Sequence, residues 1–239
     1  MSALIGVMIA IGILIECRYR DIKRELKKIQ DNMIGNKDWT GNQKSTYVTL
    51  GASNHTDKER QTEDYYATDS IAIDGLKSVW NIPQNVWEVS CGEGHLSERL
   101  KTLGHTVYST DLVDRGYGIG NVDFLKTTKL PQDCTCILTN PPYKYALEFV
   151  NHSLDLLPEG GYCVMFLKTT FLEGKKRYNN LFSINPPKYM FQFVSRVLCA
   201  KNGDFETVIA GGGSAVSYAW FVFQKGYKGD TVIKWINNS

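Results

Sequence analysis

Hydrophobic and polar positions alternate from about residue 64 to the end of the chain, in segments of two kinds. Segments with apolar residues three or four positions apart predict helices, and short runs of consecutive apolar residues predict strands. The expected helices are 70–80, capped by Asp69 or Ser70, 96–103 and 145–157; the expected strands are 85–89, 106–109, 134–139, 162–167, 219–224 and 231–236. Strands and helices joined by short turns predict an α/β domain with a mainly parallel sheet covered on both faces.

The first thirty residues follow a different pattern. Residues 1–15 carry no charged side chain, whereas residues 16–30 are rich in Lys and Arg. A fifteen-residue helix is about 22 Å long, so it needs the flanking residues to cross a bilayer core of roughly 30 Å. The pattern favours a membrane anchor formed by residues 1–20, with the basic flank holding the rest of the chain at the cytoplasmic membrane face. A helix buried against the core or a partner, and a signal segment or mis-assigned start, are the alternatives.

A heptad seam continues from this helix. Apolar residues alternate at spacings of four and three, at Ile15, Tyr19, Ile22, Leu26, Ile29 and Met33. The seam predicts either a weak homodimer or a helix that lies on its own domain. Residues 31–63 are polar and rich in Gly, Asn and Thr. We therefore expect a hydrophobic and basic helix at 1–30, a linker and loop at 31–63, and the main domain at 64–239.

Composition narrows the possible functions. The 239 residues are 43% hydrophobic with a net charge of +2, which excludes a disordered chain and a polybasic nucleic-acid coat. Contact with nucleic acid would therefore need a local basic patch. Six Cys without a CxxC pair and four scattered His predict an intracellular protein without a metal.

Candidate chemistry lies where the strands end, because open α/β sheets bind ligands at the carboxyl ends of their strands. Residues 86–94, VWEVSCGEG, end the first such strand, and Gly92 and Gly94 allow a tight turn with close backbone approach. The third glycine of a dinucleotide fingerprint is replaced by Ser97, which disfavours a pyrophosphate ligand. Glu88, just before the loop, suits a cationic ligand.

Two acidic residues follow the glycine loop at sequence spacings that suit contacts with a nucleoside. Asp111 ends the next strand about twenty residues later, where a carboxylate can accept both hydroxyl protons of a ribose diol. Asp123 and Phe124 form a polar and apolar pair that can meet an exocyclic amine and stack on a purine. Because the loop and the two acidic positions occur in this order and at this spacing, together they favour a single site for a ligand with a ribose and a purine.

Residues 137–143, ILTNPPY, are the most specific motif. The two prolines fix a rigid turn after the strand. We expect this turn to direct the Asn140 amide oxygen and backbone carbonyls at one point, with the Tyr143 ring beside them. Such a site accepts hydrogen bonds from an amino group and stacks on the planar group that carries it.

These motifs resemble those of amino-group methyltransferases, above all N6-adenine DNA methyltransferases. The segment ILTNPPY matches their signature, WEVSCGEG resembles their S-adenosylmethionine loop, and Asp64-Tyr65-Tyr66-Ala67-Thr68 resembles their upstream cofactor motif. Residues 39–239 as a whole are similar to phage and prophage proteins of this type. The resemblance implies a Rossmann-like methyltransferase fold, S-adenosylmethionine as cofactor, and transfer of a methyl group to adenine N6 of DNA in a prokaryotic or phage setting.

The resemblance also assigns roles to residues. The catalytic residues would be Asn140, Pro141, Pro142 and Tyr143. The cofactor-binding residues would be Tyr66, Thr68, Glu88, Ser90, Cys91, Gly92, Gly94, Asp111, Leu112, Asp123, Phe124 and Asn140. The reaction needs no covalent nucleophile, so Cys91 is not given that role.

A local basic segment follows the catalytic strands. Lys168, Lys175, Lys176 and Arg177 would contact the phosphate backbone, although a solvated loop explains them equally well. Three other functions remain open. The same motifs suit a methyltransferase acting on RNA guanine or protein glutamine, and the chain could be an inactive binding module tethered to a membrane. A dinucleotide oxidoreductase is disfavoured by the missing glycine.

Overall fold

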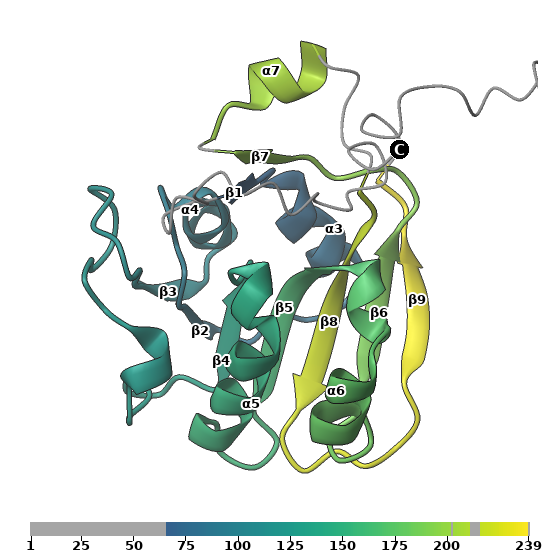
Figure 1. The fold of residues 1–239 in the computed structure, drawn as a ribbon. Helices are drawn as coiled ribbons and strands as arrows, with labels where there is room; N and C mark the ends of the chain where they lie inside the picture. The colour runs from purple at the N-terminus through teal and green to yellow at the C-terminus, as the bar shows by residue number, and fades with distance from the viewer. Residues whose placement is uncertain (1–65, 202, 211–215, 239) are drawn as a thin grey trace, which may run out of the picture. The chain divides into compact units, whose positions relative to one another are not determined.

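The computed structural model describes residues 66–238 apart from residue 202 and residues 211–215 (Figure 1). The chain divides into two units, 1–55 and 56–239, and every described residue belongs to the second. The helix predicted at 1–30, its heptad seam, and the linker at 31–63 lie outside the described residues. Within the described part of the chain, no helix combines the length and apolar character needed to cross a membrane.

A seven-stranded sheet forms the centre of the unit, in the order β3-β2-β4-β5-β8-β6-β9. Its strands are β2 (Asn85–Glu88), β3 (Thr106–Ser109), β4 (Cys136–Thr139), β5 (Tyr162–Lys168), β6 (Tyr189–Phe193), β8 (Tyr218–Gln224) and β9 (Val232–Ile236). Neighbours from β3 to β5 pair in parallel, as do β6 and β9, whereas β8 pairs antiparallel with both β5 and β6. The predicted mainly parallel sheet is confirmed.

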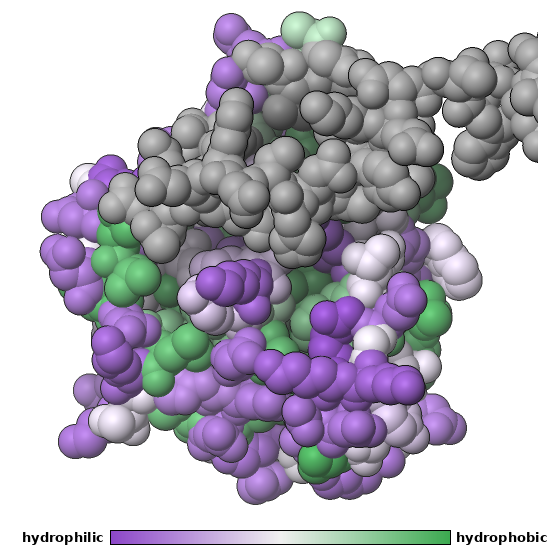
Figure 2. Space-filling model, viewed as in Figure 1, coloured by the Kyte–Doolittle hydropathy of each residue, from purple (hydrophilic) through white to green (hydrophobic). Residues whose placement is uncertain are grey.

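Helices cover both faces of this sheet, as the sequence predicts (Figure 1). Helices α3 (Ile71–Val79) and α4 (His95–Thr102) pack on one face, and α5 (Ala146–Leu156) packs on the other. On the α5 face, the short helix α6 (Lys175–Arg177) leads into a π-turn at Tyr178–Phe182. The surface over α5 and α6 is mainly hydrophilic, as expected for helices that bury one side (Figure 2).

Strand β5 shows how the sequence divides the core between the two layers. Cys163, Met165 and Leu167 point to the face covered by α5, and Val164 and Phe166 point to the face covered by α3 and α4. All five side chains are almost completely buried. A strand buried on both faces has no polar alternation, which is why it appears in the sequence as a continuous apolar run.

Local signals fix the helix that precedes the glycine loop. Ala72, Ile73 and Leu76 form the buried side of α3. Asp69 accepts a hydrogen bond from the Ile71 N–H at 3.0 Å, which satisfies one of the unpaired amides at the helix start. The Trp220 indole N–H donates to the Ala72 carbonyl at 2.9 Å and ties the helix to β8.

A second, two-stranded sheet was not predicted. Strand β1 (Tyr66–Thr68) pairs antiparallel with β7 (Cys199–Lys201), and the short helix α7 (Phe205–Ala210) follows β7. This small sheet lies across the carboxyl ends of the central strands (Figure 1). It therefore brings residues 66–68 and 199–201, which are far apart in the sequence, to the edge where the candidate chemistry lies.

Candidate active site

The candidate site lies at the carboxyl edge of the sheet, where the strand order reverses. Strand β2 has β3 on one side and β4 on the other, so the chain leaves β2 in one direction and later returns to its opposite edge. A crevice forms outside the strand ends at such a switch point, and ligands of open α/β sheets bind there. The glycine loop, Asp111 and Asn140 follow β2, β3 and β4 respectively.

The glycine loop makes a tight connection from β2 to α4. Gly92 and Gly94 have positive φ angles of 55° and 88°, which side chains with a Cβ rarely adopt. The Cys91 N–H donates to the Thr110 carbonyl at 3.0 Å, so the loop is tied to the end of β3. A Cβ on Gly94 would lie 2.4 Å from the Tyr117 ring, so only glycine fits beneath that ring.

Asp111 binds the glycine loop directly. One carboxylate oxygen accepts the Gly92 N–H at 2.8 Å, and the other accepts the Val113 N–H at 2.9 Å. A carboxylate oxygen has two acceptor positions, so each oxygen retains one for a further donor. Leu112, the next residue, is 61% exposed. The structure thus brings together the acidic residue and the loop that the sequence spacing paired.

Glu88 lies beneath the loop in a closed environment. Its carboxyl group is 2% exposed and accepts a hydrogen bond from the Ser97 hydroxyl, which in turn lies 2.6 Å from the Ser109 hydroxyl. Burial raises the pKa of Glu88 to about 8, so the group is mostly neutral at pH 7. A cofactor contact at Glu88 stays a prediction; in the structure the side chain supports the loop from the α4 side through Ser97.

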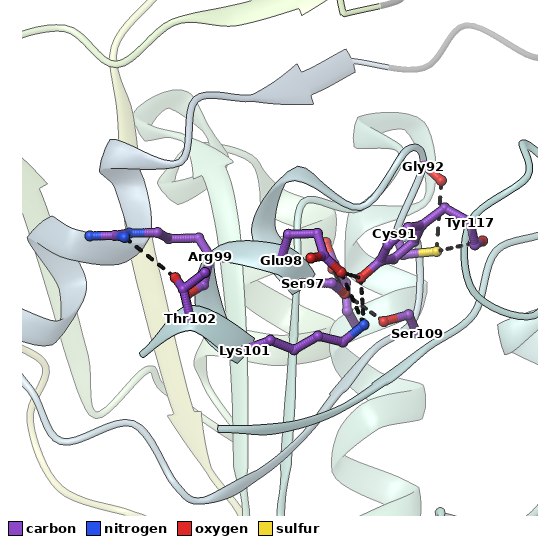
Figure 3. Close-up of polar contacts among 10 residues, drawn as sticks. Cys91, Gly92, Ser97, Glu98, Arg99, Lys101, Thr102, Ser109 and Tyr117 are labelled. Atoms are coloured by element: carbon purple, nitrogen blue, oxygen red, sulfur yellow. Dashed lines mark hydrogen bonds and ion pairs between the residues drawn. The ribbon is translucent and has the colours of Figure 1, made fainter. Parts of the chain in front are cut away.

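Tyr117 is a residue of this region that the sequence analysis missed (Figure 3). Its hydroxyl donates to Glu98 at 2.6 Å and accepts from the Lys101 ammonium at 2.9 Å, so the side chain lies along α4. Its ring covers Gly94. The signal available in the sequence was the placement of this Tyr between Gly116 and Gly118, both of which have positive φ angles.

Cys91 is protonated at neutral pH. Its thiol lies within 3.8 Å of the backbone oxygens of Gly92 and Tyr117 (Figure 3). Burial, with smaller contributions from the carboxylates of Glu88 and Asp111, raises the pKa of Cys91 to about 12. A thiol at such a pKa is a poor nucleophile.

The neighbouring residues Asp123 and Phe124 have different surroundings in the structure. The Asp123 carboxylate caps the short turn that follows, accepting the Leu125 N–H at 3.2 Å, and pairs with Lys126 at 2.9 Å. Phe124 is 2% exposed and packs edge-on against Trp87 with ring centroids 5.4 Å apart. We therefore assign Phe124 to the core instead of the expected purine-stacking surface, because its ring is already enclosed by protein.

Asn140 has a fixed side-chain orientation. Its amide nitrogen donates to the Thr68 hydroxyl at 2.9 Å and to the Tyr66 carbonyl at 3.2 Å. Since a carbonyl can only accept, these contacts determine which end of the amide is the nitrogen. The opposite atom, Oδ1, is buried without a hydrogen-bond partner among the described residues. Tyr66 and Thr68, predicted as cofactor contacts, therefore hold Asn140 in the structure.

The prolines after Asn140 form the predicted rigid turn. Pro141 is buried and Pro142 is exposed. The Pro142 carbonyl accepts the Tyr145 N–H at 2.8 Å, which begins a single 3-10 turn at Tyr143–Tyr145. Among the described residues, no backbone N–H donates to the Pro141 carbonyl, which leaves it as a candidate acceptor.

Tyr143 lies in an aromatic and polar cluster behind this turn. Its ring stacks on that of Tyr218 with centroids 6.0 Å apart, and its hydroxyl is 3.9 Å from the Cys199 sulfur. Burial raises the pKa of Tyr143 well above its ordinary value, so the phenol remains neutral. The Lys168 ammonium lies 5.1 Å from the centre of the Tyr143 ring.

The four predicted phosphate contacts have different surroundings. Lys168 ends β5 inside the candidate site. Lys176 pairs with Glu148 on α5 at 3.2 Å, and Arg177 lies over the Phe171 ring and donates to the Glu173 carbonyl. Lys175 is exposed. A phosphate role for this segment stays a prediction, with Lys175 best placed for it.

Across residues 66–238, outside the gaps given above, no three side chains from His, Cys, Asp and Glu are grouped so that they could hold a metal ion.

Comparisons of this chain with known proteins identify a similar fold among solved structures. No protein-family model matches the chain, and no curated protein matches its sequence. Among solved structures, the predicted O-methyltransferase Atu636 of Agrobacterium tumefaciens matches with a TM-score of 0.50 and 10% identity, over 71% of this chain and 86% of that one. At this identity the match shows a shared fold. The chain therefore has the methyltransferase fold.

Two further structures are similar at lower scores. A protein of Listeria monocytogenes assigned to the class I S-adenosylmethionine-dependent methyltransferases has a TM-score of 0.47 and 11% identity, over 70% of this chain and 64% of that one. The M protein of the type I restriction enzyme EcoKI has a TM-score of 0.43 and 14% identity, over 66% of this chain and 42% of that one. This chain thus spans less than two thirds of either protein.

Proposed function

We propose that the chain is an S-adenosylmethionine-dependent methyltransferase that acts on the exocyclic amine, N6, of adenine in DNA. The observation that carries the proposal is the orientation of Asn140. Its amide nitrogen is bound by Tyr66 and Thr68, and its buried oxygen has no partner in the described structure. An unmatched buried acceptor costs about 1–3 kcal/mol, which is the kind of exception that marks a binding or catalytic role.

The residues around the glycine loop fit the proposed cofactor. Asp111 retains one acceptor position on each carboxylate oxygen, which suits the two hydroxyls of a ribose. Gly92 and Gly94 keep the backbone of the neighbouring loop compact, and Leu112 offers an exposed apolar surface beside Asp111. When bound, S-adenosylmethionine supplies a methyl group on a positively charged sulfur, which keeps the bonding electron pair when the methyl leaves.

The chain's own residues would prepare the amine. Asn140 Oδ1 and the Pro141 carbonyl each accept one N6–H hydrogen bond, which turns the nitrogen lone pair out of conjugation with the purine. Because both groups are held in place before substrate binds, little reorganisation is needed as charge develops on the nitrogen. Neither acceptor is basic at neutral pH, so the proton lost from the methylated amine passes to water.

DNA is the proposed partner because the site suits a planar, aromatic amine. Tyr143 lies directly after the acceptor turn, and an adenine must leave its duplex stack to reach such a site. The motif resemblance to phage and prophage adenine methyltransferases points to the same substrate. RNA guanine and protein glutamine are the alternatives that a substrate comparison separates.

We also propose that residues 1–20 anchor the enzyme to the cytoplasmic face of a membrane. Their uncharged sequence with a basic flank motivates it. Cell fractionation of the full-length chain and of a form starting at residue 36 tests it: only the full-length chain should sediment with membranes. A full-length protein that is soluble and monodisperse without detergent would exclude the anchor.

Methyl transfer from labelled S-adenosylmethionine tests the proposed function. Purified protein is incubated separately with unmethylated DNA, RNA and a protein extract, beside an Asn140→Ala variant. Label should enter DNA with the native protein and stay at background with the variant. If label enters only RNA or only protein, the assignment of DNA as the substrate is wrong. Equal transfer by Asn140→Ala would refute the proposed site.

A further inference from the structure

Lys168 lies in the candidate site although it belongs to the basic segment predicted to bind phosphate. It is the last residue of β5, and its register partner on β8 is Tyr218, which stacks on Tyr143. Its ammonium lies over the Tyr143 ring, 5.1 Å from the centroid. The side chain is half-buried, in contrast to the exposed Lys175.

A chain of contacts connects Lys168 to Asn140. Asn140 binds the Thr68 hydroxyl, which lies 3.9 Å from the Cys199 sulfur, and Cys199 lies 3.9 Å from the Tyr143 hydroxyl. Burial raises the pKa of Cys199 to about 11, and the nearby charge of Lys168 partly opposes this rise. The ammonium therefore belongs to the same cluster as the acceptor turn and the aromatic ring.

The chemistry of a lysine side chain restricts what it can recognise. An ammonium group has three donors and no acceptor, so it can meet only an acceptor on a substrate. Asn140 Oδ1 and the Pro141 carbonyl are both acceptors. The site thus presents acceptors for an amine together with a donor for an atom near that amine.

We propose that Lys168 binds the target base by donating a hydrogen bond to the ring nitrogen beside the exocyclic amine. This inference rests on the proposed function and names a residue that would position the base. In adenine, N6 lies between two unprotonated ring nitrogens, N1 and N7, either of which can accept. In guanine, the amine lies between a protonated N1 and an unprotonated N3, so only one of its two ring neighbours can accept.

The contact seen in the structure is compatible with this role. Stacking of a nucleobase on an aromatic ring can exceed the contact of a half-buried ammonium with that ring, so an entering base can displace the ammonium from the ring face. The flexible four-carbon stem of lysine lets the ammonium move to the edge of the base. Lys168 and Tyr143 would therefore act on the edge and the face of the same base.

Adenine analogues test this contact atom by atom. One substrate is DNA copied with 7-deaza-dATP, and the other is a single-stranded oligonucleotide carrying 1-deazaadenine. Each is compared with its unmodified counterpart. Native protein, Lys168→Met and Lys168→Gln are compared, with Lys175→Met as a control for general loss of a positive charge. Calorimetric binding of S-adenosylmethionine shows that each variant is folded.

Native protein should lose about 10- to 100-fold in kcat/KM on one of the two analogues, the range for a lost charge-assisted hydrogen bond. Lys168→Met should lose a similar factor on adenine and nothing further on that analogue. Lys168→Gln, which keeps a donor, should retain part of the sensitivity. Lys175→Met should respond to the analogues like the native protein.

Two outcomes would overturn the inference, and they are distinguishable. If native protein methylates adenine but is indifferent to both analogues, or if Lys168→Met remains as sensitive as the native protein, Lys168 does not read the base. If native protein methylates no adenine in unmodified DNA, the proposed function fails and the inference fails with it.

Discussion

Replacing Thr68 with Val distinguishes two possible roles of this residue, which are to position Asn140 and to bind the cofactor, as the sequence motif implies. The Thr68 side chain is 2% exposed, and its hydroxyl accepts the Asn140 amide N–H at 2.9 Å. Valine has nearly the same shape but cannot accept a hydrogen bond. The Asn140 nitrogen would keep only the weaker contact with the Tyr66 carbonyl at 3.2 Å, so the amide would be less firmly oriented.

The size of the effect follows from one lost neutral hydrogen bond. Such a bond contributes about 1 kcal/mol, which corresponds to roughly a fivefold lower rate if the loss falls on the transition state. Removing the Asn140 acceptor altogether sets the upper limit, about two to three orders of magnitude. We therefore expect Thr68→Val to lower kcat about fivefold.

The assay measures kcat for methyl transfer at saturating S-adenosylmethionine and, separately, the dissociation constant of the cofactor by calorimetry. Thr68→Val should change kcat and leave cofactor affinity within twofold, and Thr68→Ser, which keeps the hydroxyl, should restore most of the rate. An unchanged kcat with weaker cofactor binding would refute the positioning role and return Thr68 to the cofactor site.

Three other predictions follow from the same geometry. Asn140→Ala should lower turnover about two to three orders of magnitude without loss of cofactor binding, and Asn140→Asp should retain some activity because a carboxylate is also an acceptor; kinetics with calorimetry checks both. Asp111→Ala should weaken cofactor binding by about 1–3 kcal/mol, whereas unchanged affinity would exclude the ribose contact. Burial raises the pKa of Glu88 from its ordinary 4.5 to about 8, so the native state holds a proton that the unfolded chain releases. Stability should therefore fall as the pH rises from about 4.5 to about 8, and Glu88→Gln should remove that part of the slope in chemical unfolding at several pH values.

The fold of the central domain could be predicted because its signals are local. The nine predicted helices and strands of the α/β domain are all present, with ends within two residues of the expected ones. Runs such as Tyr162–Lys168 are apolar because both sheet faces are covered, and the expected helices have apolar residues at helical spacing. Strands β1 and β7 were missed because they are three residues long and pair across more than 130 positions.

The candidate site could be predicted in part. Spacing placed Asp111 beside the glycine loop and Asn140 at the end of a strand, because both positions follow directly from where strands end. The surroundings of Glu88 and Phe124 could not be predicted, because burial depends on which helix packs above each strand end. The orientation of Asn140 depends on β1, and therefore on the long-range pairing that the sequence pattern does not reveal.

Identification of the methylated nucleoside is the most direct test of adenine methylation by this protein. The full-length chain and its Asn140→Ala variant are expressed in a bacterial host that lacks adenine methylation, and the DNA is digested to nucleosides for mass spectrometry. N6-methyldeoxyadenosine should appear with the native chain and remain at background with the variant. Native chain that is expressed and binds S-adenosylmethionine, yet leaves adenine unmodified while methylating another base or another polymer, would contradict that prediction.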